Sequence, residues 1–210
     1  MTARRLWDIS QTLRPGLPVW PGDTEYALER TWRMEDGSPV NVARLTLSTH
    51  SGTHADAPLH YSADGADAGG MALDPYLGEC LVVDARAAAG RAVEADDLPP
   101  LDGATRVLLR TYDAFPHDRW RSDWTPVAPE TIRFLASEGV RLIGTDAPSL
   151  DPETSQAMAA HLAVLAADMR ILEGLVLDEV PPGRYELIAL PLKIAGGDAG
   201  LCRALLRELA

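Results

Sequence analysis

Cysteine is scarce in this chain, and its scarcity narrows the possible chemistry. There are 2 cysteines among 210 residues, and Cys80 and Cys202 lie too far apart to form a Cys-x-x-Cys motif. We therefore predict two buried free thiols, with no structural disulfide and no thiolate-bound metal. Any metal site would have to use histidine and carboxylate side chains.

Positive charge is also in short supply. The chain has 19 Lys and Arg residues against 31 Asp and Glu residues, which gives a formal net charge of −12 and a pI near 4.7. This balance argues against nucleic acid and against an anionic membrane surface as partners. It does not identify a substrate.

Long uncharged apolar runs are missing as well. The segment Met1–Asp8 has two arginines with no apolar run behind them, so we predict no secretory signal and a cytoplasmic protein. The most apolar region, 162–180, contains several charged residues, which excludes an ordinary membrane span. The length and the 46% hydrophobic content fit a single domain covering residues 1–210.

Histidine is clustered: three of the 5 histidines fall between positions 50 and 60, with an aspartate among them. His50, His54, Asp56 and His60 all occupy even positions, so in an extended segment their side chains share one face. A straight strand would hold His50 and His54 roughly 13 Å apart, whereas ligands of one ion lie about 3 Å apart. The chain must therefore bend, and Gly52 permits the bend. The cluster predicts a metal site; a strand end with polar side chains facing solvent is the alternative.

Two residues later in the chain are unusual for a plain core. His161 lies in an apolar helical run, where a lone histidine is more often a hydrogen-bonded core residue than a ligand. Glu173 lies in an apolar stretch, where a buried carboxylate is costly unless it is paired or binds a metal. A cation near His50, His54 and Asp56 would explain both. Five donors exceed the three protein ligands of one open zinc site, so two ions about 3.5–4 Å apart are expected. Imidazole suits zinc, while the carboxylates also tolerate manganese.

Trp20 is a third candidate site residue. It lies in the loop 14–23, which has three prolines and two glycines. The ring either packs onto the protein's own core or offers a flat face to an aromatic ligand.

The hydrophobic pattern predicts an α/β fold with a single mixed sheet. The expected strands are 7–10, 42–48, 80–85, 105–111, 140–145, 169–172 and 185–194, and the expected helices are 129–138 and 149–167. Alternation of strands and helices in the second half implies parallel pairing through right-handed crossovers, while the helix-poor first half favours antiparallel pairing. The loop that ends near residue 125 is long enough to suggest a functional role.

The run from His50 to His60 resembles the H-x-G-T-H-x-D-x-P-x-H signature of the cyclase family of metal-dependent hydrolases. Within that family the whole chain resembles the bacterial kynurenine formamidases, also called arylformamidases. The stretches that carry this wider resemblance are Val-Trp-Pro-Gly-Asp at 19–23, Gly-Thr-Asp-Ala-Pro-Ser at 144–149, Leu-Glu-Gly at 172–174 and Leu-Pro-Leu-Lys-Ile at 190–194. The resemblance implies a swivelling β/β/α fold and a homodimer.

The same resemblance implies roles for the site residues. Two zinc ions are expected, one bound by His50, His54 and Asp56, the other by Asp56, His161 and Glu173. His60 would then transfer protons, and Trp20 would contact the substrate. The implied reaction is hydrolysis of N-formyl-L-kynurenine to L-kynurenine and formate, in tryptophan degradation. A different aryl or cyclic amide, such as isatin, and a non-catalytic metal-binding module are the alternatives.

One stretch departs from the family pattern. Where formamidases usually show Gly-Ala-Asp-Gly-Ser-Pro-Val-Arg, residues 196–203 read Gly-Gly-Asp-Ala-Gly-Leu-Cys-Arg. The Ser-Pro helix start is replaced by Gly200-Leu201, so we expect a weaker helix N-cap. If this loop borders the pocket, substrate preference is affected and the metal site is not. Lys193 could bind a substrate carboxylate, but a strand lysine is more often solvated.

Overall fold

A computed structural model describes residues 4–209 of the chain, so Met1–Ala3 of the segment read for a signal lie outside it. Within the described range the central element is a seven-stranded sheet in the order β1-β11-β9-β5-β6-β7-β8. Its strands are β1 (Leu6–Asp8), β5 (Leu77–Asp84), β6 (Arg106–Arg110), β7 (Leu142–Thr145), β8 (Arg170–Leu172), β9 (Gly183–Ile188) and β11 (Leu205–Glu208). The mixed-sheet α/β prediction is confirmed.

The sheet is parallel on one side and antiparallel on the other. Strands β5, β6, β7 and β8 pair in parallel, as predicted for β6, β7 and β8. The first-half strand β5 also belongs to this parallel group, because the connector 85–104 crosses over without a long helix. Strand β9 is antiparallel to both β5 and β11, and β11 is antiparallel to β1. The expectation that first-half strands pair antiparallel holds for β1 and for the antiparallel edge of β5 with β9, and it is wrong for the edge of β5 that pairs with β6.

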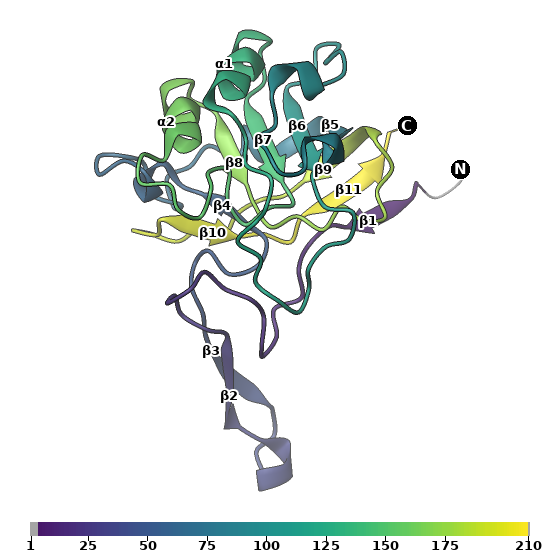
Figure 1. Cartoon of the computed structure of the whole chain (residues 1–210). Helices are drawn as coiled ribbons and strands as arrows, with labels where there is room; N and C mark the ends of the chain where they lie inside the picture. The colour runs from purple at the N-terminus through teal and green to yellow at the C-terminus, as the bar shows by residue number, and fades with distance from the viewer. Residues whose placement is uncertain (1–3, 210) are drawn as a thin grey trace.

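Two apolar cores lie on opposite faces of the sheet. Helices α1 (Pro129–Ser137) and α2 (Ala159–Ala166) cover one face, where Leu109 and Ile143 are fully buried beneath them (Figure 1). The opposite face packs against the short strands β4 (His54–Asp56) and β10 (Ala199–Leu201). Burial of these cores drives folding. Ala55 and Ala57 belong to the second core, so its packing also holds the histidine cluster against the sheet.

Helix α2 begins ten residues later than predicted. Pro152 and the capping residues at 149–151 favour a helix that starts there, but the chain stays irregular until Ala159. The amide groups of Ala160 and His161 donate instead to the side chain of Asp151, across the loop. The segment 149–151 therefore does supply a cap for α2, but the cap reaches the helix through a tertiary contact and not from the adjacent position.

Strands β2 (Ala27–Trp32) and β3 (Val42–Thr46) form an antiparallel hairpin that projects from the body of the protein (Figure 1). The alternating pattern of 42–48 predicts a half-buried strand, but every residue of β2 and β3 is exposed. The prediction is wrong because no other element of the described chain covers either face of the hairpin. Its exposed apolar side chains are Leu28, Trp32, Met34, Val40, Val42 and Leu45.

The variant stretch near the C-terminus is a strand and not the start of a helix. Ala199, Gly200 and Leu201 form β10, which pairs antiparallel with β4 of the histidine cluster. A Cβ atom at Gly200 would lie 2.8 Å from Pro191, so the small residue here permits close packing. Cys80 and Cys202 are buried free thiols, as predicted. In the described part of the chain no helix has the length and hydropathy needed to cross a bilayer.

Candidate metal centre and substrate cavity

Strand β4 carries the centre of the histidine cluster and is held on both sides. On one side it pairs with β10, which places Asp56 opposite Ala199. On the other side His54 forms an isolated antiparallel bridge with Glu173, just beyond the end of β8. The amide of Glu173 donates to the carbonyl of His54 at 3.0 Å. Backbone pairing therefore brings the N-terminal cluster next to the buried glutamate.

Two glycines allow this close approach. Gly52 has φ +66°, a left-handed conformation that favours glycine, so the predicted bend between His50 and His54 is present. Gly174 has φ +64°, and a Cβ atom there would lie 2.5 Å from the carbonyl oxygen of Gly52. The turn that presents His50 and His54 packs directly on the backbone that presents Glu173.

The first donor set consists of His50, His54 and Asp56. His50 Nδ1 lies 3.2 Å from His54 Nε2 and 3.1 Å from Asp56 Oδ1, and His54 Nε2 lies 3.3 Å from the same oxygen. Tetrahedral ligands with bonds of about 2.0–2.1 Å have donor atoms about 3.3 Å apart. The three atoms are therefore spaced as ligands of one ion.

The second donor set shares Asp56 with the first. Asp56 Oδ2 lies 3.3 Å from His161 Nε2, which lies 3.6 Å from Glu173 Oε1. The other oxygen of Glu173 lies 3.5 Å from His54 Nε2, so this carboxylate faces both sets. The arrangement has the five donors and the shared carboxylates of a two-ion centre.

Asp56 supplies the clearest sign that the centre suits a cation. Its side chain is fully buried, yet neither carboxylate oxygen accepts a well-formed hydrogen bond from any described residue. Burial raises the pKa of Asp56, but its imidazole neighbours His161, His50 and His54 outweigh burial and hold the pKa well below its usual range. Burial lowers the pKa of His54, but ion pairs with Asp56 and Glu173 raise it to about 10. These opposite pKa shifts show that the buried carboxylates favour positive charge beside them. A bound metal ion would supply that charge in place of the protons on the histidines.

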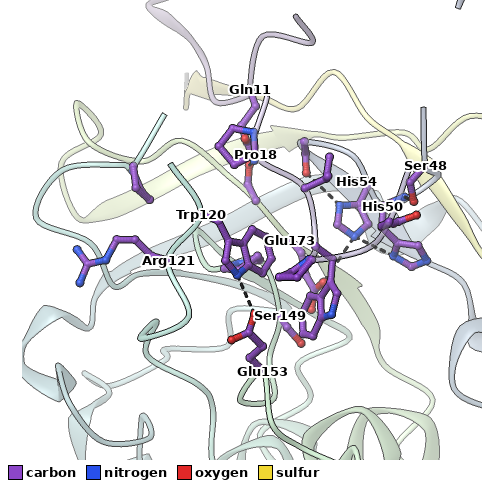
Figure 2. Close-up of a pocket in the computed structure, with 18 of the residues that line it drawn as sticks. Gln11, Pro18, Ser48, His50, His54, Trp120, Arg121, Ser149, Glu153 and Glu173 are labelled. Carbon is purple, nitrogen blue, oxygen red and sulfur yellow. Dashed lines mark hydrogen bonds and ion pairs between the residues drawn. The ribbon is translucent and has the colours of Figure 1, made fainter. Parts of the chain in front are cut away.

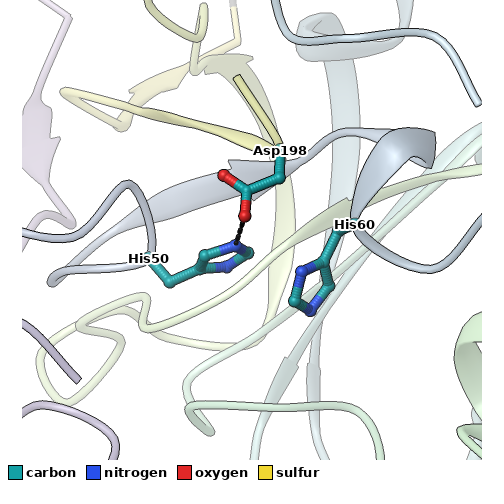
Figure 3. Close-up of side chains that lie close together, drawn as sticks. All are labelled: His50, His60 and Asp198. Carbon is teal, nitrogen blue, oxygen red and sulfur yellow. Dashed lines mark ion pairs between the residues drawn. The ribbon is translucent and has the colours of Figure 1, made fainter. Parts of the chain in front are cut away.

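The ring nitrogens that face away from the donor cluster meet acceptors of different kinds. His161 Nδ1 lies 2.6 Å from Asp151 Oδ2, and His54 Nδ1 lies 3.0 Å from the carbonyl oxygen of Gly52. His50 Nε2 lies 3.5 Å from Asp198 Oδ2, a longer contact (Figure 3). Acceptors at these positions orient an imidazole so that its other nitrogen faces a metal. Asp151 and Asp198 were not predicted as site residues.

His60 lies beside the two donor sets and belongs to two further groups whose donor atoms lie within 4.8 Å of one another, one with His50 and Asp198 and one with Asp56 and His161. It ends a short 3-10 turn (Pro58–His60), and its ring centroid lies 4.2 Å from that of His50 (Figure 3). The ring centroid of His161 lies 6.0 Å away. Its ring opens into the cavity, but nearby protein atoms desolvate it and lower its pKa below the ordinary value. A largely neutral imidazole next to a metal centre can accept and return a proton.

A cavity of about 620 Å³ opens from this cluster toward an aromatic wall. His50, His54, His60, His161 and Glu173 line its inner end. Trp20, Trp120 and Trp124 pack edge to face with ring centroids 5.4–5.6 Å apart, and the first two line the outer end.

The structure shows how Trp20 is packed, while its contact with an aromatic ligand stays a prediction. It packs against its own protein, and it remains 38% exposed at the cavity. Trp120 donates its Nε1–H to Glu153 at 2.8 Å, which fixes its ring in the wall (Figure 2). The long loop that carries Trp120 and Trp124 is thus part of the pocket, as its length suggested.

Asp146 lines the cavity and anchors that long loop. It follows β7, is 1% exposed, and accepts hydrogen bonds from the amides of Thr111 and Tyr112 at 2.8–3.0 Å. Burial raises the pKa of this carboxyl to about 6, although these hydrogen bonds oppose the shift. Lys193 is exposed, and the described residues that line the cavity do not include it.

Residues 7–152 match the family described as Putative cyclase. The chain therefore belongs to the putative cyclase family. It is similar to the kynurenine formamidase of Erythrobacter litoralis, with 70% identity over 206 residues that cover 98% of this chain and 95% of that one. It is also similar to the kynurenine formamidase of Sphingopyxis alaskensis, with 58% identity over 207 residues that cover 98% of this chain and 99% of that one.

Solved structures share the same architecture. A potential metal-dependent hydrolase with cyclase activity superimposes with a TM-score of 0.84 at 32% identity, covering 99% of this chain and all of that one. Isatin hydrolase A from Labrenzia aggregata gives a TM-score of 0.82 at 23% identity, covering 99% of this chain and 94% of that one. The second likeness concerns the fold alone.

Proposed function

We propose that this protein is a metal-dependent kynurenine formamidase that hydrolyses N-formyl-L-kynurenine to L-kynurenine and formate, a step of tryptophan degradation. The observation that carries the proposal is one cavity with a buried His and carboxylate cluster at its inner end and tryptophans at its outer end. The 70% identity to a kynurenine formamidase over nearly the whole chain supports the same substrate.

The proposed metal ligands are the two donor sets described above. His50, His54 and Asp56 would hold one ion, and Asp56, His161 and Glu173 the other, with Glu173 near both. We propose zinc, two ions per subunit, because imidazole donors favour it; the carboxylates leave manganese as a substitute. When bound, such ions supply a water nucleophile of lowered pKa and polarise a carbonyl oxygen.

His60 is the proposed general acid and base. Its ring faces the same space as the donor sets, and a nitrogen of His60 lies within 4.8 Å of donor atoms of Asp56 and His161. In this role His60 takes a proton as the formyl carbon is attacked, and returns it to the nitrogen of the departing aryl amine. The depressed pKa keeps its ring neutral and able to accept that proton.

Trp20 is the proposed binding surface for the aryl ring of the substrate. Its indole is braced edge to face by Trp120 and Trp124, so it can present a fixed flat surface. An aryl ring held there would direct its formamide group toward the inner end of the cavity. The aromatic wall would then determine substrate binding, and the donor cluster would determine the hydrolysis step.

We also propose a cytoplasmic homodimer. The hairpin β2–β3 has apolar side chains that no other element of residues 4–209 covers, such as Trp32 at 59% exposure and Leu28 at 48%. A lone two-stranded hairpin is marginally stable in water, so burial of these side chains against a second copy would stabilise it. Free buried thiols suit a reducing compartment.

The function is tested by hydrolysis of N-formyl-L-kynurenine by the purified protein, before and after chelation and with zinc restored. We expect release of kynurenine that a chelator abolishes and zinc restores. Absence of release from metal-loaded protein would remove the substrate assignment, and isatin would be the next compound to test. Metal-loaded protein that hydrolyses no aryl or cyclic amide would favour a non-catalytic binding module.

The dimer is tested by the molar mass of the protein in solution. We expect light scattering after size exclusion to give twice the 22.6 kDa chain mass. Replacement of Trp32 and Leu28 by serine should shift the mass toward the monomer. A native monomer, or a variant that remains fully dimeric, would contradict the proposed role of the hairpin.

A further inference from the structure

Asp151 is a buried carboxylate that the proposed reaction does not use. Its residue is 4% exposed, and it lies on the irregular segment between β7 and α2. Its Oδ2 lies 2.6 Å from His161 Nδ1 and accepts the His161 amide at 3.1 Å, while its Oδ1 accepts the Ala160 amide at 3.1 Å. One side chain thus contacts both the backbone and the ring of His161.

The start of helix α2 depends on this contact. Met158, at the N-cap position, gives no side-chain cap and has the left-handed values φ 46° and ψ 47°, which are uncommon for a residue with a side chain. Asp151 accepts the first-turn amides that would otherwise lack partners. Because the carboxylate accepts hydrogen bonds from two successive amides, these bonds alone fix the position of the His161 backbone relative to Asp151.

The ring contact selects one form of the imidazole. A carboxylate beside Nδ1 accepts a hydrogen from that nitrogen, which leaves the lone pair on Nε2. His161 Nε2 is the atom that lies 3.3 Å from Asp56 and 3.6 Å from Glu173. The form of His161 that Asp151 favours is therefore the form that can bind a metal in the second donor set.

The backbone around Asp151 contacts other parts of the site. The amide of Leu150 donates to Glu173 Oε1 at 3.0 Å, and Trp124 donates its Nε1–H to the carbonyl oxygen of Asp151 at 3.0 Å. The dipeptide Leu150–Asp151 therefore contacts both His161 and Glu173, and also the aromatic wall. A helix cap needs only the hydrogen bonds to the first-turn amides, so the contacts with the His161 ring, Glu173 and Trp124 are additional to that role.

We propose that Asp151 is a positioning residue that holds His161 in its Nε2-coordinating form and so sets the affinity of the second metal position. The proposal rests on the metal site of the proposed function and is independent of the substrate. Asp198 Oδ2 lies 3.5 Å from His50 Nε2 on the first donor set, but without the hydrogen bond that Asp151 makes to His161.

The test measures zinc affinity by competition with a chromophoric chelator, using the full-length protein. We expect Asp151→Ala to weaken one zinc-binding step by about 100-fold and Asp151→Asn, which keeps a neutral acceptor, by about 10-fold. Nitrogen NMR of the zinc-loaded protein, labelled in histidine, should show His161 protonated at Nδ1 in the native chain and altered in both variants. If Asp151→Ala does not fold, the asparagine variant decides.

Asp146→Asn is the matched control, because Asp146 is also a buried carboxylate that accepts two backbone amides, and among the described residues it has no hydrogen bond or ion pair with a histidine. We expect it to leave zinc affinity and the His161 signals unchanged. Native zinc affinity with unchanged His161 signals in both Asp151 variants would overturn the proposal, as would equal weakening by Asp146→Asn. Lack of kynurenine release by the native enzyme would affect the proposed function alone, since zinc binding is measured directly.

Discussion

The inner and outer ends of the cavity are built in opposite ways. At the inner end, His54, Asp56, His161 and Glu173 are 0–3% exposed, and backbone pairing or buried hydrogen bonds hold each of them. At the outer end, Trp20 is 38% exposed on a proline-rich loop and is held mainly by ring contacts. Fixed donor geometry suits bond cleavage, whereas a partly exposed aromatic wall suits selection among substrates.

This difference separates the part of the site that can vary from the part that cannot. A donor cluster tied into β4, β8 and β10 cannot shift without disturbing the sheet, so it constrains the chemistry. Loops 14–23 and 111–125 can change side chains with little cost to the core. The comparison predicts that substitutions at the inner end abolish turnover, and that those at the outer end change binding.

The largest effect is expected from Asp56→Ala, since this carboxylate belongs to both donor sets. We expect loss of bound metal at both positions. Turnover should fall by more than the roughly 10²–10⁴-fold that a positioned acid–base group contributes. Metal analysis together with kynurenine release measures both effects. A folded variant that retains its full metal content would contradict the shared role of Asp56.

The next largest effect is expected from His60→Ala. His60 lies beside the donor sets without belonging to them, so the variant should keep its metal and lose about 10²–10⁴-fold in kcat. Metal content and initial rates, measured on the same preparation, separate the two properties. Full activity in this variant would eliminate His60 as the proton-transfer group, and loss of metal would make it a ligand.

A smaller effect, on stability, is expected from Asp146, which joins the outer loop to the sheet. Its pKa rises from 3.8 to about 6 on folding, so the stability it contributes is complete below pH 3.8 and is lost as the pH rises through about 6. The loss relative to Asp146→Asn should be about 3 kcal/mol, from about 1.4 kcal/mol per unit. Urea unfolding of both proteins between pH 4 and 7 measures it; parallel pH curves would refute the assignment.

The smallest effect is expected from Trp20→Ala at the outer end. Aromatic contacts contribute about 0.5–1.5 kcal/mol beyond burial, so KM for N-formyl-L-kynurenine should rise about tenfold while kcat and metal content stay near native. Trp20→Phe should have a weaker effect, because it retains an aromatic face. A fall in kcat with unchanged KM would place Trp20 in catalysis and break the distinction between the two ends.

The sequence predicted most of the inner end because its signals are local. The spacing of His50, His54 and Asp56, with Gly52 between them, specifies a bent segment with donors on one face. His161 and Glu173 lie in apolar stretches of sequence, which indicates that their polar side chains are buried for a functional reason. The structure brings all five together, although their roles as ligands stay a prediction.

The features that the sequence did not predict depend on contacts between distant segments. The capping residues at 149–151 predict a helix that begins beside them, whereas Asp151 accepts the first-turn amides of α2 across a loop. The alternation in β3 predicted a buried face, but burial depends on a partner element, and the described chain provides none for the hairpin. Gly200-Leu201 was compared with a helix start, yet pairing with β4 makes it a strand.

The pairing of β4 with β10 also makes the site depend on contacts between distant parts of the chain. Asp56 pairs with Ala199, and His54 forms its bridge with Glu173. Contacts between residues so far apart in sequence require closure of long loops, which slows their formation during folding. The geometry of the histidine cluster is therefore expected to form late in folding, and metal capture should follow it.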